Sequence, residues 1–353
     1  MAVQKKSAAK RPAGNAAPKA PKAAKVGGAG KAPAASAKKG RGGLYVTLAL
    51  IAALGGLGVQ AFYVARQKAA MKFDFIRTGS IIPQGLADGQ GTGPTALAGD
   101  SEGNIFFLDG AERSDMRLQK FDKNEKFVGK YKPTRGEQVL GKAMDLAVDA
   151  EGGVYVLRSD GTILEMDNDL RFKAAVPVKV SDPSAMAVSD DGRIFVASRG
   201  DNKIQVFGND GHVITEFGAA KTQSGDIATP IRLCFDAAGD LAVLEDLPES
   251  PRLKLFDKDL KMVRSFRLLG VSMCPPLRLG ADDKGRLFIN DFSGNTGILI
   301  YRLDKGKQIG QVKGTSQGDL FVSPGSVGVN RFTGAILVHT IPGLIPCTMP
   351  VGH

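Results

Sequence analysis

Opposite charges recur at one fixed place in a repeated hairpin of this sequence, and these charged residues are candidates for ligand recognition. Each hairpin has two short apolar stretches joined by a glycine-containing turn, so the residues on either side of the turn can be paired in register. Three of the predicted pairs carry opposite charges: Asp145 with Arg158, Arg232 with Glu245, and Arg278 with Asp291.

Two interpretations of these pairs are open. In the first they are cross-strand ion pairs that only satisfy each other, each worth less than about 1 kcal/mol when exposed. In the second they form a polar ring at the mouth of a central channel. Arg232 and Arg278 stand at equivalent points of consecutive repeats, so positive charge is concentrated in one sector. A carboxylate or an acidic peptide could compete for these guanidinium groups, because arginine offers a bidentate fork.

The sequence gives less support to a metal site, a cofactor or a disulfide. The three histidines (His212, His339 and His353) and three cysteines (Cys234, Cys274 and Cys347) show no metal-ligand spacing. A calcium site built from Asp109, Asp145, Glu245 and Asp291 is conceivable, although arginines stand beside or opposite some of these acids. No cofactor is therefore predicted. A disulfide between Cys274 and Cys347, both expected in loops, stays open.

The hairpins belong to a long internal repeat. A turn-plus-strand signature occurs six times, with marker glycines at Gly103, Gly152, Gly192, Gly239, Gly285 and Gly334. The markers are 49, 40, 47, 46 and 49 residues apart. The best-defined copy, residues 183–218, has four short alternating stretches, which predicts a four-stranded meander. Four-stranded units repeated at this period are typical of a β-propeller, and six markers predict six blades.

The repeat resembles the NHL family, whose unit runs from a leading proline through an apolar strand, an Asp-x-x-Gly turn and a strand that ends in phenylalanine. The leading proline stands at Pro94, Pro183, Pro230, Pro276 and Pro324 and is missing before the second blade. The resemblance implies an all-β, six-bladed NHL-type propeller. Relatives of this kind include metal-dependent amidating lyases and lactonase-type enzymes, so a hydrolase or lyase is the alternative to a binding module.

The two ends of the repeat region are expected to meet. Residues 72–82 align with the outer hairpin of the third blade, which places Phe75 on Phe207, whereas the last repeat (328–340) is expected to lack an outer hairpin. Joining the two would close the ring and remove its exposed edges. The propeller is therefore predicted over 72–342, with residues 343–353 as a C-terminal tail.

The N-terminal region lacks the repeat and consists of a basic segment followed by an apolar one. Residues 1–43 hold nine lysines, two arginines and no acid, and this excess accounts for the whole formal charge of +11. This Lys/Ala/Pro-rich tail is expected to be disordered. Residues 44–65 are an uncharged apolar run of 22, long enough for a single transmembrane helix. The preceding positive charges predict a cytoplasmic N-terminus, and a basic tail of this kind can touch anionic lipid.

The sequence thus predicts a membrane-tethered, extracytoplasmic propeller that acts as a protein- or ligand-binding scaffold, and it favours a binding module over an enzyme. The rest of the chain is balanced at 36 basic and 36 acidic residues, which argues against a nucleic-acid partner. A protein or peptide partner at the propeller face is expected instead. The candidate face residues are Arg232, Arg278, Asp145, Arg158, Glu245 and Asp291.

Overall fold

The computed structural model describes residues 71–72, 75–110, 116–136, 138–218, 226–269, 271, 278–291, 297–318, 321, 326–340 and 343–349. All of them fall within one compact unit, Leu57–His353. The predicted tail (1–43) and the predicted transmembrane helix (44–65) lie outside these residues. Within the described part, no helix is long and apolar enough to cross a bilayer.

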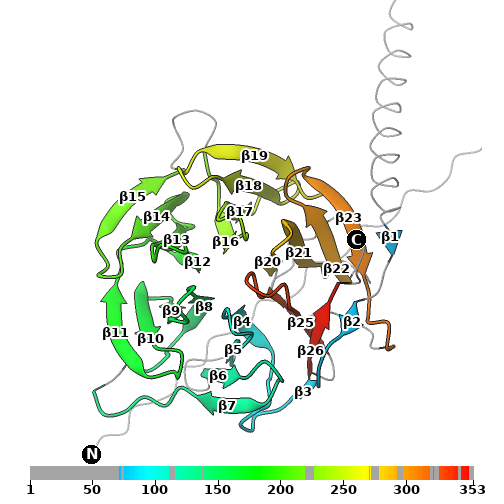
Figure 1. The fold of residues 1–353 in the computed structure, drawn as a ribbon. Helices are drawn as coiled ribbons and strands as arrows, with labels where there is room; N and C mark the ends of the chain where they lie inside the picture. The colour runs from blue at the N-terminus through cyan, green and yellow to red at the C-terminus, as the bar shows by residue number, and fades with distance from the viewer. Residues whose placement is uncertain are drawn as a thin grey trace, which may run out of the picture. The chain divides into compact units, whose positions relative to one another are not determined.

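The described residues form six β-sheets arranged as the blades of a propeller (Figure 1). Blade one contains β4 (Pro94–Gly99), β5 (Ile105–Asp109), β6 (Arg117–Phe121) and β7 (Phe127–Lys130), and blade two contains β8 (Ala143–Val148), β9 (Val154–Arg158), β10 (Thr162–Met166) and β11 (Phe172–Pro177). Blade three contains β12 (Pro183–Val188), β13 (Ile194–Ser198), β14 (Lys203–Phe207) and β15 (Val213–Phe217), and blade four contains β16 (Pro230–Phe235), β17 (Leu241–Glu245), β18 (Arg252–Phe256) and β19 (Met262–Arg267). The prediction of an all-β, six-bladed propeller is confirmed.

The last two blades also contain strands from the start of the described chain. Blade five contains β20 (Leu279–Ala281), β21 (Arg286–Asp291), β22 (Gly297–Arg302), β23 (Lys307–Val312) and, at its outer edge, β1 (Met71–Lys72). Blade six contains β24 (Ser326–Val329), β25 (Ile336–Thr340), β26 (Gly343–Thr348) and, paired with β26, β2 (Ile76–Arg77) and β3 (Ile82–Pro83). The first strand of each blade is innermost, so β4, β8, β12, β16, β20 and β24 surround the centre of the ring.

The repeated turn explains why these sequences fold into hairpins. All six marker glycines have a positive φ, between 66° and 91°, which side chains rarely adopt. A polar residue at the head of each turn (Asp, Ser or Asn) holds it closed. In blade one, for example, Asp100 Oδ1 accepts the main-chain N–H groups of Glu102 at 3.1 Å and Asn104 at 2.8 Å. The sequence signature therefore marks a backbone geometry.

The apolar core lies between the blades. Six clusters of buried apolar side chains fill the six spaces between neighbouring sheets. Small residues of the inner strands allow adjacent blades to interlock, because a Cβ atom on Gly328 would lie 2.6 Å from Leu97 and one on Gly280 would lie 2.8 Å from Val329. The ring is thus held together by close packing around its whole circumference.

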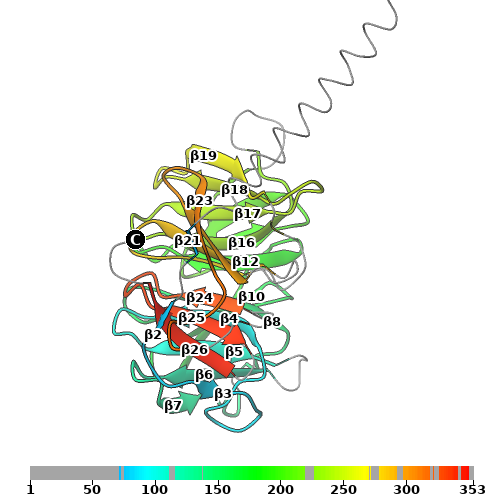
Figure 2. The same ribbon diagram turned by 90° about the vertical axis from the view of Figure 1, so that its right-hand side faces the viewer.

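The ring closes near the point that the sequence predicts, but with different strands. β2 pairs with β26 through Ile76 and Thr348, and β3 pairs with β26 through Ile82 and Leu344 (Figure 2). The N-terminal segment therefore supplies only the outer edge of blade six. The third strand comes from the predicted C-terminal tail, so the assignment of residues from 343 onward to a tail is wrong for Gly343–Thr348.

Phe75 does not occupy the position of Phe207 either. Phe207 pairs with Ile194, and the equivalent partner of Ile336 in blade six is Cys347. Cys347 is thus buried in a strand, not placed in a loop, while Cys274 lies outside the described residues. Phe75 is fully buried between blades five and six, with its ring centroid 6.1 Å from that of Phe288 and 5.9 Å from that of Phe321.

The predicted charge pairs are also wrong, by one residue. A β-bulge in the first strand of blades one to four shifts the register, so Asp145 lies opposite Leu157 and Arg232 lies opposite Leu244. In blade five, the N–H of Asn290 donates to the carbonyl oxygen of Arg278 at 3.3 Å, and Asp291 pairs with Gly297. The charged residues of the inner strands are therefore separated from their predicted partners.

Candidate functional site

The inner strands enclose a cavity of about 120 Å³ at the centre of the ring. Its wall is mostly small and apolar, with residues such as Ala98, Ala147, Ala187 and Gly280. Four charged side chains line it among the described residues: Asp145, Arg232, Arg278 and Arg331. Three of these are predicted site residues, now gathered from three different blades.

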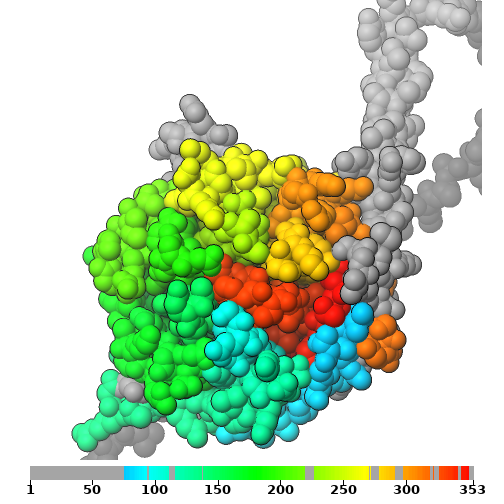
Figure 3. Space-filling view, in the orientation of Figure 1, coloured from blue at the N-terminus to red at the C-terminus, as the bar shows by residue number. Residues whose placement is uncertain are grey.

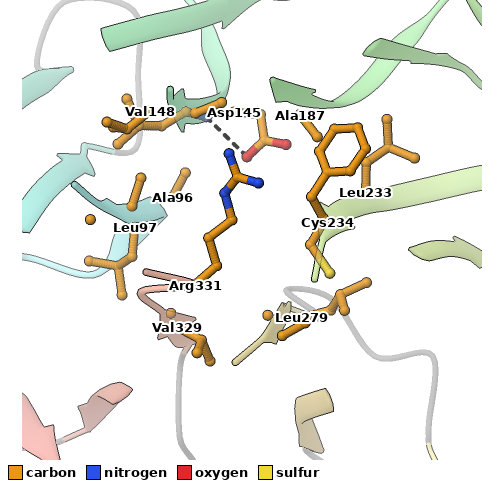
Figure 4. A pocket seen from close by; sticks show the side chains of 18 of the residues that line it. Ala96, Leu97, Asp145, Val148, Ala187, Leu233, Cys234, Leu279, Val329 and Arg331 are labelled. Atoms are coloured by element: carbon orange, nitrogen blue, oxygen red, sulfur yellow. Dashed lines mark hydrogen bonds between the residues drawn. The ribbon is translucent and has the colours of Figure 1, made fainter. Parts of the chain in front are cut away.

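Asp145 projects from β8 into this cavity (Figure 4). Its Oδ2 atom accepts the N–H of Met186, in the neighbouring β12, at 2.9 Å, and its Oδ1 atom accepts the N–H of Leu146 at 3.0 Å. Burial raises the pKa of Asp145, and the nearby Arg232 and Arg278 oppose this shift. The carboxylate is thus fixed in place by two backbone donors.

Arg232 comes from β16 in blade four. Its Nη1 atom donates to the carbonyl oxygen of Ile231 at 2.6 Å and to that of Ser184, in β12, at 3.3 Å. Burial lowers the pKa of Arg232, while the charge of Asp145 raises it. This guanidinium group is therefore held against the channel wall by main-chain acceptors.

Arg278 stands directly before β20 in blade five and differs from Arg232 in one respect. Its Nε and Nη1 atoms are buried and have no hydrogen-bond partner among the residues that the structure describes. Burial lowers the pKa of Arg278 to about 9, and Arg232 adds to this effect while Asp145 opposes it. The side chain therefore stays protonated at neutral pH. A buried charged donor without an acceptor is unfavourable, so this group would gain from a bound anion.

Arg331 is the fourth charged group, and it reaches into the channel from the turn between β24 and β25 (Figure 4). Its Nη2 atom forms an ion pair with Asp190 Oδ1 at 2.8 Å and donates to the carbonyl oxygen of Val188 at 3.4 Å. Its guanidinium group lies over the rings of Phe332, at 4.6 Å, and Phe235, at 5.8 Å. Arg331 therefore links blade six with blades three and four across the ring.

The remaining predicted site residues do not line this cavity. Glu245 is fully buried inside blade four, where it forms ion pairs with Arg252 and Lys254. Arg158 pairs with Asp160 near the end of β9. Asp291 is the last residue of β21, and its side chain lies outside the described part of the structure. The predicted pairs Asp145–Arg158 and Arg232–Glu245 are therefore not formed.

The described residues do not form a set of metal ligands. No group of three or more His, Cys, Asp or Glu side chains within that part is arranged to hold a metal ion. Of the acids that could form the conceivable calcium site, Asp109 is fully buried in an ion pair with Arg117, and Glu245 is engaged as above. Neither lines the cavity with Asp145, so these three carboxylates are not gathered into one ligand set.

His339 is packed within its blade. It lies opposite Ser326 in the β24–β25 pair, and neither His339 Nε2 nor Ser326 Oγ has a hydrogen-bond partner in the described structure. Burial lowers the pKa of His339, and the charge of Asp109 partly offsets this.

Sequence reasoning missed Arg331. The turn of this repeat is one residue longer than the others, as the sequence of residues 328–340 shows (GVNRFTGAILVHT). This insertion was the only local sign that the turn differs from the other five. The longer turn carries the Arg331–Phe332 pair over the channel, as the space-filling view shows for the segment between β24 and β25 (Figure 3). Which residues an inserted turn reaches depends on blades far away in the sequence, so the insertion alone could not identify Asp190 as the partner.

Comparisons with known proteins support the fold alone. No protein-family model and no curated protein sequence matches the chain. Among solved structures, a streptogramin B lyase aligns with a TM-score of 0.50 and 14% identity, over 77% of this chain and 87% of the lyase. A protein of unknown function from Bacteroides caccae aligns with a TM-score of 0.46 and 14% identity, over 62% of this chain and 80% of the other. The propeller fold, but no activity, is therefore shared with a lyase.

Proposed function

We propose that this chain is an NHL-type binding propeller that recognises an acidic group of a protein or peptide partner in its central channel. Arg278 carries this proposal, because two buried guanidinium nitrogens with no partner among the described residues are unfavourable until an anion approaches. Arg232 adds a second positive charge to the same cavity. The apolar remainder of the wall would strengthen this attraction, since charges interact more strongly away from water.

We also propose that the propeller is tethered to a membrane by residues 44–65 and displayed outside the cytoplasm. This proposal is supported by the length of the uncharged run and by the eleven positive charges that precede it. A tethered propeller of this kind would act as a scaffold that holds its partner at the membrane surface.

A metal-dependent hydrolase or lyase is the competing proposal. The propeller fold is shared with streptogramin B lyase, but the same fold hosts many activities. Metal analysis of the purified full chain separates the two proposals: a stoichiometric metal would favour the enzyme.

The binding proposal is tested by recovering partners from solubilised membranes with the full chain as bait. The Arg232→Ala/Arg278→Ala double variant should lose a partner that the unmodified chain retains. The matched control is Arg171→Ala/Arg264→Ala, because both of these arginines are exposed on outer strands or their turns. If the channel variant retains the same partners as the control, the proposal is wrong.

A further inference from the structure

The charges in the channel define what kind of anion fits there. Of the four charged side chains in the wall, Arg331 is already neutralised by Asp190. The other three charged side chains among the described residues of the wall are Arg232, Arg278 and Asp145, so this part of the wall carries one more positive than negative charge when Asp145 is ionised. A singly charged anion would neutralise this surplus. A doubly charged anion would instead leave an excess negative charge beside the Asp145 carboxylate, which is unfavourable in a site with little water.

The size of the cavity also favours a small anionic group. About 120 Å³ is well below the roughly 300 Å³ at which pockets for drug-sized ligands begin. A carboxylate group and a few carbon atoms fit this space, so only the end of a larger ligand can enter it.

The cavity also has one closed end. Asp145, Arg232 and Arg278 all stand four residues before the acidic residue that heads their turn, whereas Arg331 and Asp190 belong to the turns themselves. Four residues of extended chain separate these levels by about 13 Å. On the turn side, the segment between β24 and β25 covers the middle of the ring (Figure 3), and the Arg331–Asp190 pair crosses it. A ligand would therefore enter from the opposite side, past Arg232 and Arg278.

We propose that the channel is a blind pocket for one singly charged carboxylate group, and that Asp145 determines this specificity by rejecting doubly charged anions such as sulfate or phosphate esters. This inference rests on the proposed function and specifies the chemistry of the group that is recognised. The carboxylate enters end-on and is neutralised by Arg232 and Arg278. Asp145 is a specificity-determining residue, and its two backbone hydrogen bonds keep its charge facing the ligand.

The test is a calorimetric titration of the purified full chain, in non-ionic detergent and at constant ionic strength, with sodium acetate and separately with sodium sulfate. At neutral pH acetate should bind more tightly than sulfate. Arg278→Ala should weaken acetate binding on the order of tenfold or more, as expected for the loss of a charge-assisted hydrogen bond. Asp145→Asn should reverse the preference in favour of sulfate. The matched control Asp259→Asn removes an exposed carboxylate from a distant turn and should leave both affinities unchanged.

Acidification supplies a readout that needs no variant. Protonation of Asp145 raises the surplus to two positive charges, so the sulfate affinity of the unmodified chain should rise as the pH falls. Asp145→Asn should lack this dependence. The groups that face Asp145 are the guanidinium groups of Arg232 and Arg278 and the N–H of Met186, and all of these keep their protons over this range.

The outcomes separate the inference from the proposed function. Tighter binding of sulfate than acetate to the unmodified chain at neutral pH would overturn the inference, and so would no binding of either anion. In both cases the proposed function would stand if partner recovery still required the arginines. The chain could prefer acetate while the Arg232→Ala/Arg278→Ala variant still recovers the same partner. That result would leave the inference intact and refute the proposed function.

Discussion

Glu245 and Arg252 lie opposite each other on β17 and β18, and the Nε atom of Arg252 donates to Oε2 of Glu245. The other carboxylate oxygen accepts the N–H of Ala228 at 2.8 Å and lies 3.5 Å from Lys254 Nζ. Glu245 is fully buried, so its charge depends on these partners. Asp109 and Arg117 form the same cross-strand pair in blade one, which makes this arrangement a structural device of the blades.

Replacing Glu245 should therefore destabilise the propeller without affecting the channel. Glu245→Ala leaves Arg252 and Lys254 without their buried counter-charge, and we expect a loss of about 3–5 kcal/mol in the free energy of unfolding. Urea denaturation measures this loss, with Glu216→Ala as the exposed control. A variant that unfolds normally but no longer binds acetate would show that Glu245 belongs to the binding site.

Closure of the ring should depend on Phe75. This side chain is fully buried against Phe288 and Phe321, so Phe75→Ala should lower the free energy of unfolding by about 3–5 kcal/mol. Removal of residues 71–83 should be more damaging, because it also exposes the edge of β26. The control is Val128→Ala, since that valine is 55% exposed. An unchanged melting temperature in the Phe75 variant would refute this account of closure.

Stability should also respond to the protonation of His339. Burial places its pKa in the folded state below the usual value of 6.5, so the unfolded chain binds more protons between these two values. The free energy of unfolding should therefore decrease as the pH falls from 6.5 towards the lowered pKa of His339. Comparing the pH dependence of unfolding in the unmodified chain and in His339→Gln checks this. If both show the same slope, His339 does not contribute.

The orientation proposed for the chain makes a separate prediction. Protease added to intact spheroplasts should digest the propeller and leave a small N-terminal fragment in the membrane, because the positive charges precede the apolar run. Immunoblotting with antibodies against each end detects the products. Protection of the propeller until the cells are lysed would reverse the proposed orientation.

The blades could be predicted from the sequence because their signals are local. Each turn needs a glycine with positive φ, and short apolar stretches flank it, so the marker glycines located all six hairpins. The register could not be predicted in the same way. The bulge between Ala143 and Asp145 adds one residue to one strand without disturbing its apolar pattern, and this single residue separates Asp145 from Arg158.

The last strand and the site were missed for other reasons. β26 contains Pro346, which argues against a strand in the sequence, but the outer ladder divides between β2 and β3 at this point and needs no N–H from Pro346. Arg232, Arg278 and Asp145 are candidates because of their equivalent positions in the repeats, and all three line the central cavity. Their convergence in one cavity depends on the closed ring, which no local pattern contains.

The most direct test of anion recognition in the channel is an anomalous diffraction map from crystals of the full chain soaked in sodium bromide. Bromide is a monoanion, and we expect a peak in the central cavity beside Arg278 and Arg232. The peak should disappear in Arg278→Ala crystals and when acetate is added to the soak. A cavity without a bromide peak, in crystals where bromide has bound elsewhere on the surface, would contradict the central claim.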